Sequence, residues 1–170
     1  CKKITAFEVS PDNTLYKATA DGLLIDVNGA LVAYPAGKTT IDLTGIETIE
    51  DGLFAGTALT EIVIPKTVKS IGNYAFAYSN NLKTVSLEEG SQLNSIGQYV
   101  FKESSALDTI DLANATQLAK IREFAFMNSL IKSSVIPKTV TYIDSYAFAE
   151  CKELTSVTVE GSVTMGDYAF

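Results

Sequence analysis

The chain has 170 residues, of which 46% are hydrophobic, a composition typical of a globular domain and not of a disordered segment. Its formal net charge of −7 at pH 7 argues against nucleic acid and against an anionic membrane surface as partners, because both attract basic patches. It contains no histidine, which excludes Ser-His-Asp and Cys-His catalytic arrangements and histidine-ligated metal sites. No apolar run approaches the ~20 residues of a transmembrane helix, so no transmembrane segment is expected.

The first element expected is a short strand within residues 4–9. Ile4, Phe7 and Val9 show an apolar spacing that recurs along the chain, and its final step of two is the period of a strand. Cys1 precedes this strand in a phrase that matches the one beginning at Cys151. If both cysteines occupy the same place in coils stacked at ~4.8 Å, they lie too far apart for a disulfide, which needs Cα atoms within ~7 Å. A lipidated Cys1 is an alternative that the sequence leaves open.

Residues 10–37 interrupt the pattern and predict an inserted β-hairpin. Asn28-Gly29, a dipeptide typical of two-residue hairpin turns, lies between the apolar runs 23–27 and 30–34. We expect this insert to project from one edge of the first coils or to cover it.

From residue 49 onward one phrase occurs six times, an aliphatic residue followed by four variable residues and then Phe. The successive Phe residues are separated by 22, 25, 25, 22 and 22 positions. A period of this length is typical of a solenoid, in which each repeat forms one coil that stacks on its neighbours. The residues expected to be nearly fully buried and in mutual contact are Phe54, Phe76, Phe101, Phe126 and Phe148.

Each Phe except the last is followed by an apolar triplet with the same spacing, as in Leu59, Ile62 and Ile64. These triplets, together with residues 4–9 and 40–43, predict seven short parallel strands in one column, one per coil. The segment that holds Phe is predicted to form a single helical turn, which makes the fold class an α/β solenoid. Ser134 replaces the aliphatic residue of one triplet, and we expect its hydroxyl to hydrogen-bond to the backbone.

The phrase Ile-Pro-Lys-Thr-Val, followed by Tyr-Ala-Phe, occurs within residues 64–76 and again within 136–148. Together with the apolar triplets, this pattern resembles the bacterial surface protein A-like (BspA-like) leucine-rich repeat family. The resemblance spans nearly the whole chain, and residues 22–38 are similar to an insert often found in that family. The resemblance implies a right-handed leucine-rich repeat coil in a protein that is secreted or located at a bacterial cell surface. The family has no catalytic residues that could be assigned to positions of this chain. We expect no enzyme activity, no cofactor and no metal site.

The outward-facing positions of the predicted strands form the candidate partner-binding surface. Their side chains are mostly small and polar, so that a partner could approach the sheet closely. The alternative is that these side chains only keep the sheet solvated. The residues are Glu8, Glu61, Val63, Thr84, Ser86, Thr109, Asp111, Ser133, Val135, Ser156 and Thr158.

A second aromatic column stands two residues before each Phe and is interrupted only at Gly52. These rings are expected to pack between neighbouring coils, and the alternative is a platform for sugar rings or for an apolar patch of a partner. The column consists of Tyr74, Tyr99, Phe124, Tyr146 and Tyr168.

These features predict an extracellular or cell-surface module that binds protein, and the family resemblance implies adhesion, with host matrix proteins as partners. The alternatives are a structural spacer that presents other domains and a glycan-binding solenoid that uses the aromatic column. We treat residues 1–170 as a single domain and expect it to be a fragment of a longer repeat protein, because Phe170 is itself a core position. The final coil should therefore expose an apolar face.

Overall fold

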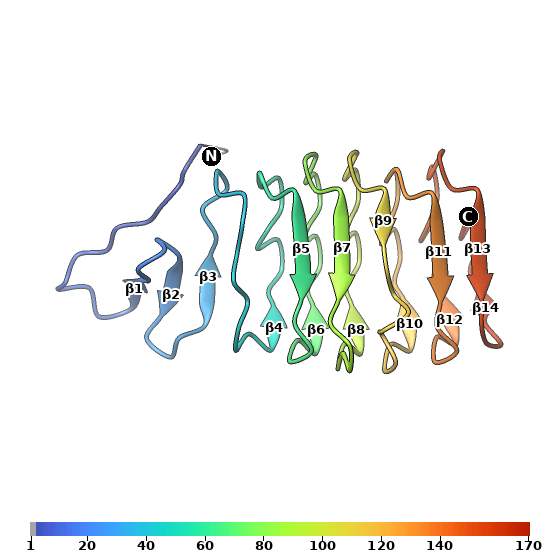
Figure 1. Cartoon of the computed structure of the whole chain (residues 1–170), viewed down its shortest axis with the longest axis horizontal. Coiled ribbons are helices and arrows are strands. Elements are labelled where there is room, and N and C mark those ends of the chain that lie inside the picture. Colours follow the sequence, from blue (N-terminus) through green and yellow to red (C-terminus); the bar gives the residue numbers. More distant parts are fainter. Residues whose placement is uncertain (1–2) are drawn as a thin grey trace.

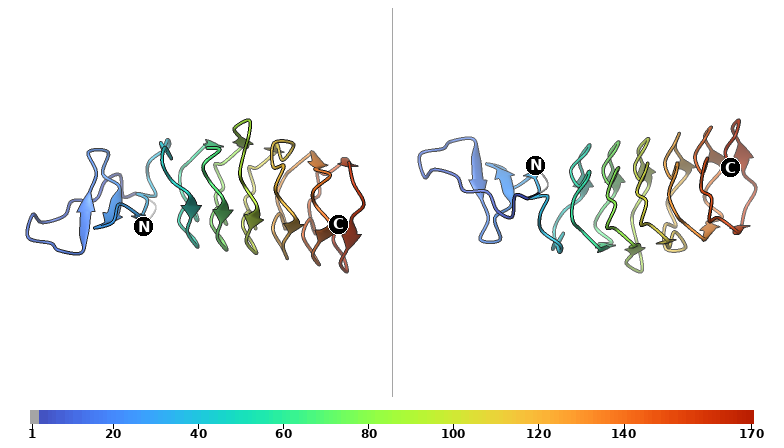
Figure 2. Two further views of the ribbon diagram at one scale, coloured as in Figure 1. Left: turned by 90° about the horizontal axis from the view of Figure 1, so that it is seen from below. Right: turned by 90° about the horizontal axis from the view of Figure 1, so that it is seen from above.

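The chain forms an elongated stack of flattened coils with a small antiparallel sheet at its N-terminal end (Figure 1). The computed structural model describes residues 3–170, so the expectations for Cys1 lie outside the described residues. Views from below and above show the coils following one another along a nearly straight axis (Figure 2). Each coil therefore contacts mainly the coil before it and the coil after it.

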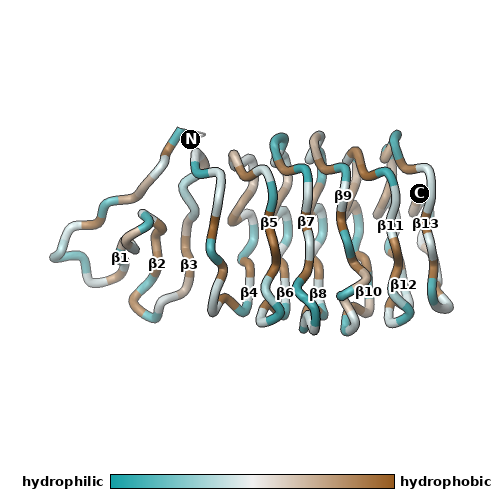
Figure 3. Tube along the Cα trace, in the orientation of Figure 1, coloured by the Kyte–Doolittle hydropathy of each residue, from teal (hydrophilic) through white to brown (hydrophobic). Residues whose placement is uncertain are grey.

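One long side of the stack consists of the short parallel strands that the apolar triplets predict. Burial alternates along them, since Ile62 and Ile64 of the first strand are buried while Glu61 and Val63 are exposed. Hydrophobic and hydrophilic positions accordingly alternate along these strands (Figure 3). The strands of this first column are β5 (Glu61–Ile64), β7 (Thr84–Leu87), β9 (Thr109–Ile110), β11 (Ser133–Ile136) and β13 (Ser156–Val159).

The prediction of seven strands in this column is wrong for its first two members, because residues 4–9 and 40–43 form no strand. The first segment bonds instead to the N-terminal insert, where the Phe7 N–H donates to the Gly22 carbonyl at 2.9 Å. In the second segment the Asp42 carboxylate accepts hydrogen bonds from the backbone N–H and the hydroxyl of Thr44, at 2.8 and 2.6 Å. These bonds turn the chain before it can pair with β5.

A second column of strands, each two residues long, lies behind the first column in the view of Figure 1. Each strand ends in the aliphatic residue that begins a Phe phrase, and Ile71 pairs in parallel with Ile49 and with Ile96. The prediction of a single strand column is therefore wrong, because this apolar step of the coil is paired as well. The strands are β4 (Thr48–Ile49), β6 (Ser70–Ile71), β8 (Ser95–Ile96), β10 (Lys120–Ile121), β12 (Tyr142–Ile143) and β14 (Thr164–Met165).

The Phe segments are turns, and no residue of the described range 3–170 belongs to a helix. Backbone N–H groups in these turns donate to the next coil, as from Phe54 to the Ala75 carbonyl at 2.8 Å. The residues two before and two after each column Phe from Phe54 to Phe148 have positive φ, with 56° at Tyr74 and 59° at Tyr78. An α-helix needs negative φ at every residue, so the predicted helical turns and the α/β class are wrong. The fold is a solenoid of parallel strands and turns.

The Phe column forms the centre of the core, as predicted. Phe54, Phe76, Phe101, Phe126 and Phe148 are each at most 1% exposed. Their rings stack nearly parallel, with centroids between 4.9 and 5.4 Å apart. Because burial of one such side chain contributes about 1.5–3 kcal/mol, this column is a principal source of stability.

The N-terminal insert covers the first end of the Phe column. Tyr34 is 5% exposed and sets its ring edge against Phe54, with centroids 5.2 Å apart. Its hydroxyl donates to the Thr40 carbonyl at 3.0 Å, and burial raises the pKa of Tyr34 to about 12. The predicted hairpin is confirmed as the second and third strands of a three-stranded sheet. Its strands are β1 (Tyr16–Ala18), β2 (Leu24–Asp26) and β3 (Leu31–Ala33).

Both strand columns are interrupted at the same place, which we call the seam. Among the described strands, β9 does not pair with β11 and β8 does not pair with β10, whereas all other neighbours within the two columns pair. The aromatic columns continue across the seam, with centroids 5.4 Å apart for Phe101 and Phe126 and 4.7 Å apart for Tyr99 and Phe124. The Phe turns and their side chains therefore join the two parts of the stack.

Two features of the chain differ on the two sides of the seam. Asp111 accepts a hydrogen bond at 2.9 Å from the backbone two residues later, which starts a turn and leaves β9 two residues long. Arg122 occupies a position held by glycine in the preceding coil, where a Cβ at Gly97 would lie 2.6 Å from the Asn73 nitrogen. Asp144 holds the same position in the following coil without breaking the ladder. A side chain at this position therefore does not by itself break a ladder.

Ser134 lies in β11, beside the seam. It is 4% exposed, and its hydroxyl has no hydrogen-bond partner within residues 3–170. The expected bond to the backbone is therefore absent. On one side Ser134 pairs with the apolar Val157 of β13, and on the other side β9 does not pair with β11. An unpaired buried hydroxyl costs about 1–3 kcal/mol.

The final coil exposes apolar side chains, as expected. Met165 and Phe170 are each 49% exposed and Tyr168 is 72% exposed. Phe170 still stacks on Phe148 with centroids 5.1 Å apart, so one face of its ring is covered.

Candidate functional site

The outward side chains of the first strand column lie in two rows. In the first row Glu61 pairs with Thr84 and Thr84 with Thr109, and in the second row Val63 pairs with Ser86. Beyond the seam the rows continue through the pairing of β11 with β13. All ten residues are exposed or half-buried, and we call this surface the strand face. Its residues are Glu61, Val63, Thr84, Ser86, Thr109, Asp111, Ser133, Val135, Ser156 and Thr158.

Glu8, the remaining residue of the predicted surface, does not belong to the strand face. It is exposed but lies in the segment that bonds to the N-terminal insert, so its inclusion is wrong. The predicted rows are correct from β5 onward because there the period of two in the sequence coincides with real strand pairing.

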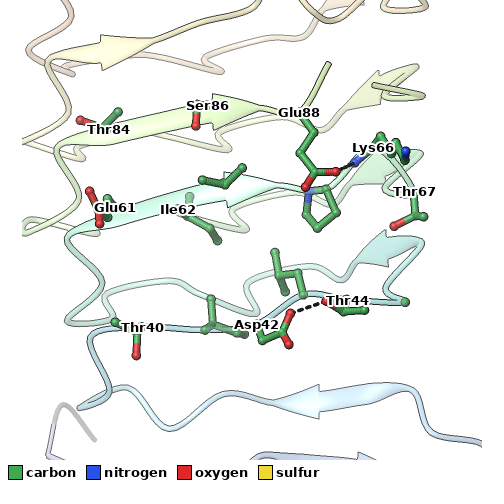
Figure 4. Close-up of a pocket in the computed structure, with 15 residues that line it drawn as sticks. Thr40, Asp42, Thr44, Glu61, Ile62, Lys66, Thr67, Thr84, Ser86 and Glu88 are labelled. Carbon is green, nitrogen blue, oxygen red and sulfur yellow. Dashed lines mark hydrogen bonds between the residues drawn. The ribbon is translucent and has the colours of Figure 1, made fainter. Parts of the chain in front are cut away.

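A groove of about 580 Å³ opens at the N-terminal end of the strand face, between residues 40–45 and β5 (Figure 4). This volume is within the range of about 300–1,000 Å³ that is common for ligand sites. The groove reaches down to Leu43 and Ile62, which belong to the core, because the chain on one side of β5 is not paired with it. We call it the strand-face groove. Its apolar residues are Ile41, Val63 and Pro65, and its acidic residues are Asp42, Glu61 and Glu88.

The charge in the strand-face groove is predominantly negative. Three carboxylates line it, and Lys66 is the one basic residue among its lining. Hydrogen bonds from the Thr44 hydroxyl and then from the Thr44 backbone N–H lower the pKa of Asp42, so this carboxylate is ionised at neutral pH. Glu88 accepts a hydrogen bond from the Lys66 backbone N–H at 3.0 Å, which fixes it at the rim (Figure 4). The groove therefore favours cationic groups.

Sequence reasoning found four groove residues and missed the groove itself. Glu61, Val63, Thr84 and Ser86 were expected on an open sheet, but the spacing at residues 40–43 indicated a further strand that would have closed it. The signal that could have revealed the groove is Asp42-Leu43-Thr44-Gly45, since Asp at the first and Gly at the fourth position are typical of a tight turn.

The second aromatic column stacks between coils, as expected. Consecutive rings lie 4.7–5.3 Å apart at angles of 4–17°. Tyr74 and Tyr146 are 43% and 37% exposed, so ring edges and hydroxyls reach solvent while most ring faces cover one another. A sugar ring stacks on an aromatic face, and Tyr168 at the end of the column offers the most exposed ring. A role of this column in glycan binding stays a prediction.

The described residues offer little that resembles a reactive centre. Within residues 3–170 no group of three or more His, Cys, Asp or Glu side chains could hold a metal ion, and no helix has the length and apolar character needed to cross a membrane. The Cys151 thiol donates to the Phe126 carbonyl at 3.1 Å, and burial raises its pKa. It therefore lacks the exposed thiolate of a nucleophilic cysteine.

Residues 47–170 match six copies of the BspA type leucine rich repeat region. The chain belongs to this family. Among solved structures, a leucine-rich repeat protein from Eubacterium ventriosum ATCC 27560 is 25% identical, with a TM-score of 0.72 over 99% of this chain and 52% of that protein. The chain thus spans about half the length of that protein. The leucine-rich repeat protein TpLRR of T. pallidum, 20% identical with a TM-score of 0.56 over 92% of this chain and 85% of its own, has the same fold.

None of the curated proteins compared with the chain matches it. Leucine-rich repeat modules of the BspA type generally bind proteins and generally lack catalytic activity. Protein binding agrees with a structure that exposes a sheet of mostly small polar side chains.

Proposed function

We propose that this chain is a protein-binding module, located at the cell surface or secreted, and that the strand face is its binding surface. The observation that carries the proposal is the openness of that face, on which all ten outward residues are exposed or half-buried. Serine and threonine hold six of these positions, and such short side chains let a partner come close to the sheet. The groove at one end adds a concave, acidic region to an otherwise flat surface.

An adhesive role, with an extracellular matrix protein as partner, is the specific form of this proposal. It is supported by the family and by the net charge of −7, which disfavours nucleic acid and anionic membranes as alternative partners. The elongated stack also presents its rows over several coils, so one partner could contact many repeats at once (Figure 1).

The test measures binding of the purified chain to a panel of purified extracellular matrix proteins by biolayer interferometry. Ser86→Arg and Ser156→Arg place a bulky charge on the strand face on either side of the seam, and at least one should weaken binding 10-fold or more. Ser162→Arg, at an exposed position outside the strand face, is the matched control and should bind like the unaltered chain. If no matrix protein binds, or if all three variants bind alike, the spacer alternative is favoured.

A further inference from the structure

The strand-face groove contains a strand edge whose backbone groups are not paired. The Ile64 carbonyl accepts a hydrogen bond from Glu88 at 3.0 Å, in the coil of β7, so this residue of β5 points its carbonyl toward β7. In a parallel ladder alternate residues bond to opposite sides, which directs the N–H and C=O groups of Glu61 and Val63 the other way. On that side no hydrogen bond joins residues 40–45 to β5 in the part of the chain that the structure describes.

The side chains around this edge have a definite chemical pattern. Val63, 56% exposed, lines the groove together with Ile41 and Pro65. Asp42 and Glu61 supply negative charge from the two sides of the groove, since one belongs to the turn segment and the other to β5 (Figure 4). A ligand that pairs with the edge would therefore meet both apolar side chains and carboxylates.

We infer that the strand-face groove binds an extended peptide segment of a partner protein, which adds as a strand to the free edge of β5 and carries an apolar side chain between two basic ones. Unpaired strand edges are templates for such strand addition, in which main-chain hydrogen bonds give affinity and flanking side chains give specificity. A second copy of this chain is a poor occupant, because each copy carries a net charge of −7. The inference rests on the proposed function in requiring a protein partner, and it assigns the contact to one end of the strand face.

The probe is the labelled peptide acetyl-Lys-Thr-Val-Thr-Lys-amide, whose binding to the purified chain is followed by fluorescence anisotropy. We expect a Kd below about 1 mM for this short ligand. Replacing both lysines of the peptide by glutamate should abolish binding. Two further peptides carry N-methyl groups on alternate backbone amides, one set at positions 1, 3 and 5 and the other at positions 2 and 4. Strand addition predicts that one of the two sets loses binding at least 10-fold and that the other is tolerated.

The protein variants test the location. Glu61→Lys should weaken binding of the basic peptide at least 10-fold, whereas Glu160→Lys makes the same change of charge at an exposed position after β13 and should leave binding unchanged. Because the peptide modifications leave the protein unaltered, they test the inference even if a variant fails to fold.

The outcomes separate this inference from the proposed function. Equal binding of both N-methylated peptides, or equal loss in the two charge variants, would show general electrostatic attraction and overturn strand addition. Absence of peptide binding while Ser86→Arg or Ser156→Arg still weakens matrix binding would overturn the inference and leave the proposed function standing. Peptide binding in the absence of any matrix partner would contradict the adhesive form of the proposed function and leave the inference standing. If the unaltered chain forms dimers and Glu61→Lys disrupts them, a second copy occupies the groove, which would also contradict the inference.

Discussion

The part of the stack before the seam and the part after it are built from the same repeat, but they are joined differently from the coils within each part. Within each part, both strand columns and the buried Phe column are continuous. Across the seam the strand ladders stop, while the Phe turns and both columns of rings continue, and the Phe101–Phe126 separation of 5.4 Å is the largest in the buried column. Beside the strands, Lys132 also crosses the seam, since its backbone N–H donates to the Asp108 carbonyl at 3.3 Å and its ammonium group lies 3.2 Å from the Asp108 carboxylate. Hydrogen bonds need N···O distances near 2.7–3.2 Å, whereas stacked rings tolerate about 4.5–7 Å. The coils stay close at the Phe turns, where the Phe101 N–H donates to the Ala125 carbonyl at 2.7 Å, so the ladders break without loss of the aromatic contacts.

The largest effect is expected from Phe101→Ala, which removes the buried ring on one side of the seam. Loss of transfer energy and creation of a cavity should lower the free energy of unfolding by about 3–5 kcal/mol, as measured by urea denaturation. Because rings rather than strands join the two parts there, unfolding should also become less cooperative. Phe76→Ala, within a continuous sheet, is the control and should keep a single transition. A melting temperature unaffected by Phe101→Ala would contradict the assigned core.

Tyr99→Ala should have the next largest effect. Tyr99 stacks on Tyr74 and, across the seam, on Phe124, and each pair is worth about 0.5–1.5 kcal/mol beyond burial. We expect a loss of about 1–3 kcal/mol in the free energy of unfolding. Tyr168→Ala removes a single stacked pair at an exposed site and should cost less. Equal costs for the two substitutions would show that stacking across the seam has no special weight.

Ser134→Val should stabilise the chain, since it replaces the unpaired hydroxyl beside the seam with the aliphatic group found in other repeats. The gain expected in thermal or urea unfolding is about 1–2 kcal/mol. Ser104→Ala is the contrasting variant, because the Ser104 hydroxyl donates to the Phe76 carbonyl at 2.7 Å and its loss should cost about 0.5–1.5 kcal/mol. Destabilisation by Ser134→Val would mean that this site has no room for the larger side chain.

Tyr34→Phe should have the smallest effect at neutral pH, about 1 kcal/mol for the lost bond to Thr40. Burial raises the pKa of Tyr34 to about 12, above the value near 10 of an unfolded tyrosine. The contribution of neutral Tyr34 is therefore complete below pH 10 and is lost as the pH rises from about 10 to 12. Urea denaturation at pH 8 and pH 11 should show a smaller drop in Tyr34→Phe than in the unaltered chain. Tyr168→Phe is the control, and an equal drop in both variants would refute the assignment.

Much of the strand face could be predicted from the sequence because its determinants are local. The period of two in β5 and β7 fixes which side chains face outward, and Asn28-Gly29 marks the place of the hairpin. Its turn differs from the expected two-residue type, because the Gly29 N–H donates to the Asp26 carbonyl at 3.1 Å, which makes Val27 and Asn28 the central residues. The positive φ values around each Phe were not predicted, although Gly52 and Gly56 hold the same two positions in the first full coil and were a readable signal. In later coils these positions are held by residues such as tyrosine and glutamate, which do not indicate positive φ.

By itself, the sequence determined the repeat period, the buried Phe column, the stacked aromatic column and the strands from β5 onward, because each depends on spacing within one coil. Only the tertiary structure decided the second strand column, the left-handed turns, the seam and the strand-face groove. Strands of two residues show no readable period, and they form only when backbone groups of neighbouring coils meet. The seam and the groove are places where these backbone groups do not pair, between β8 and β10, between β9 and β11, and between residues 40–45 and β5. Whether two coils approach closely enough to pair is a property of both coils together, which no single repeat encodes.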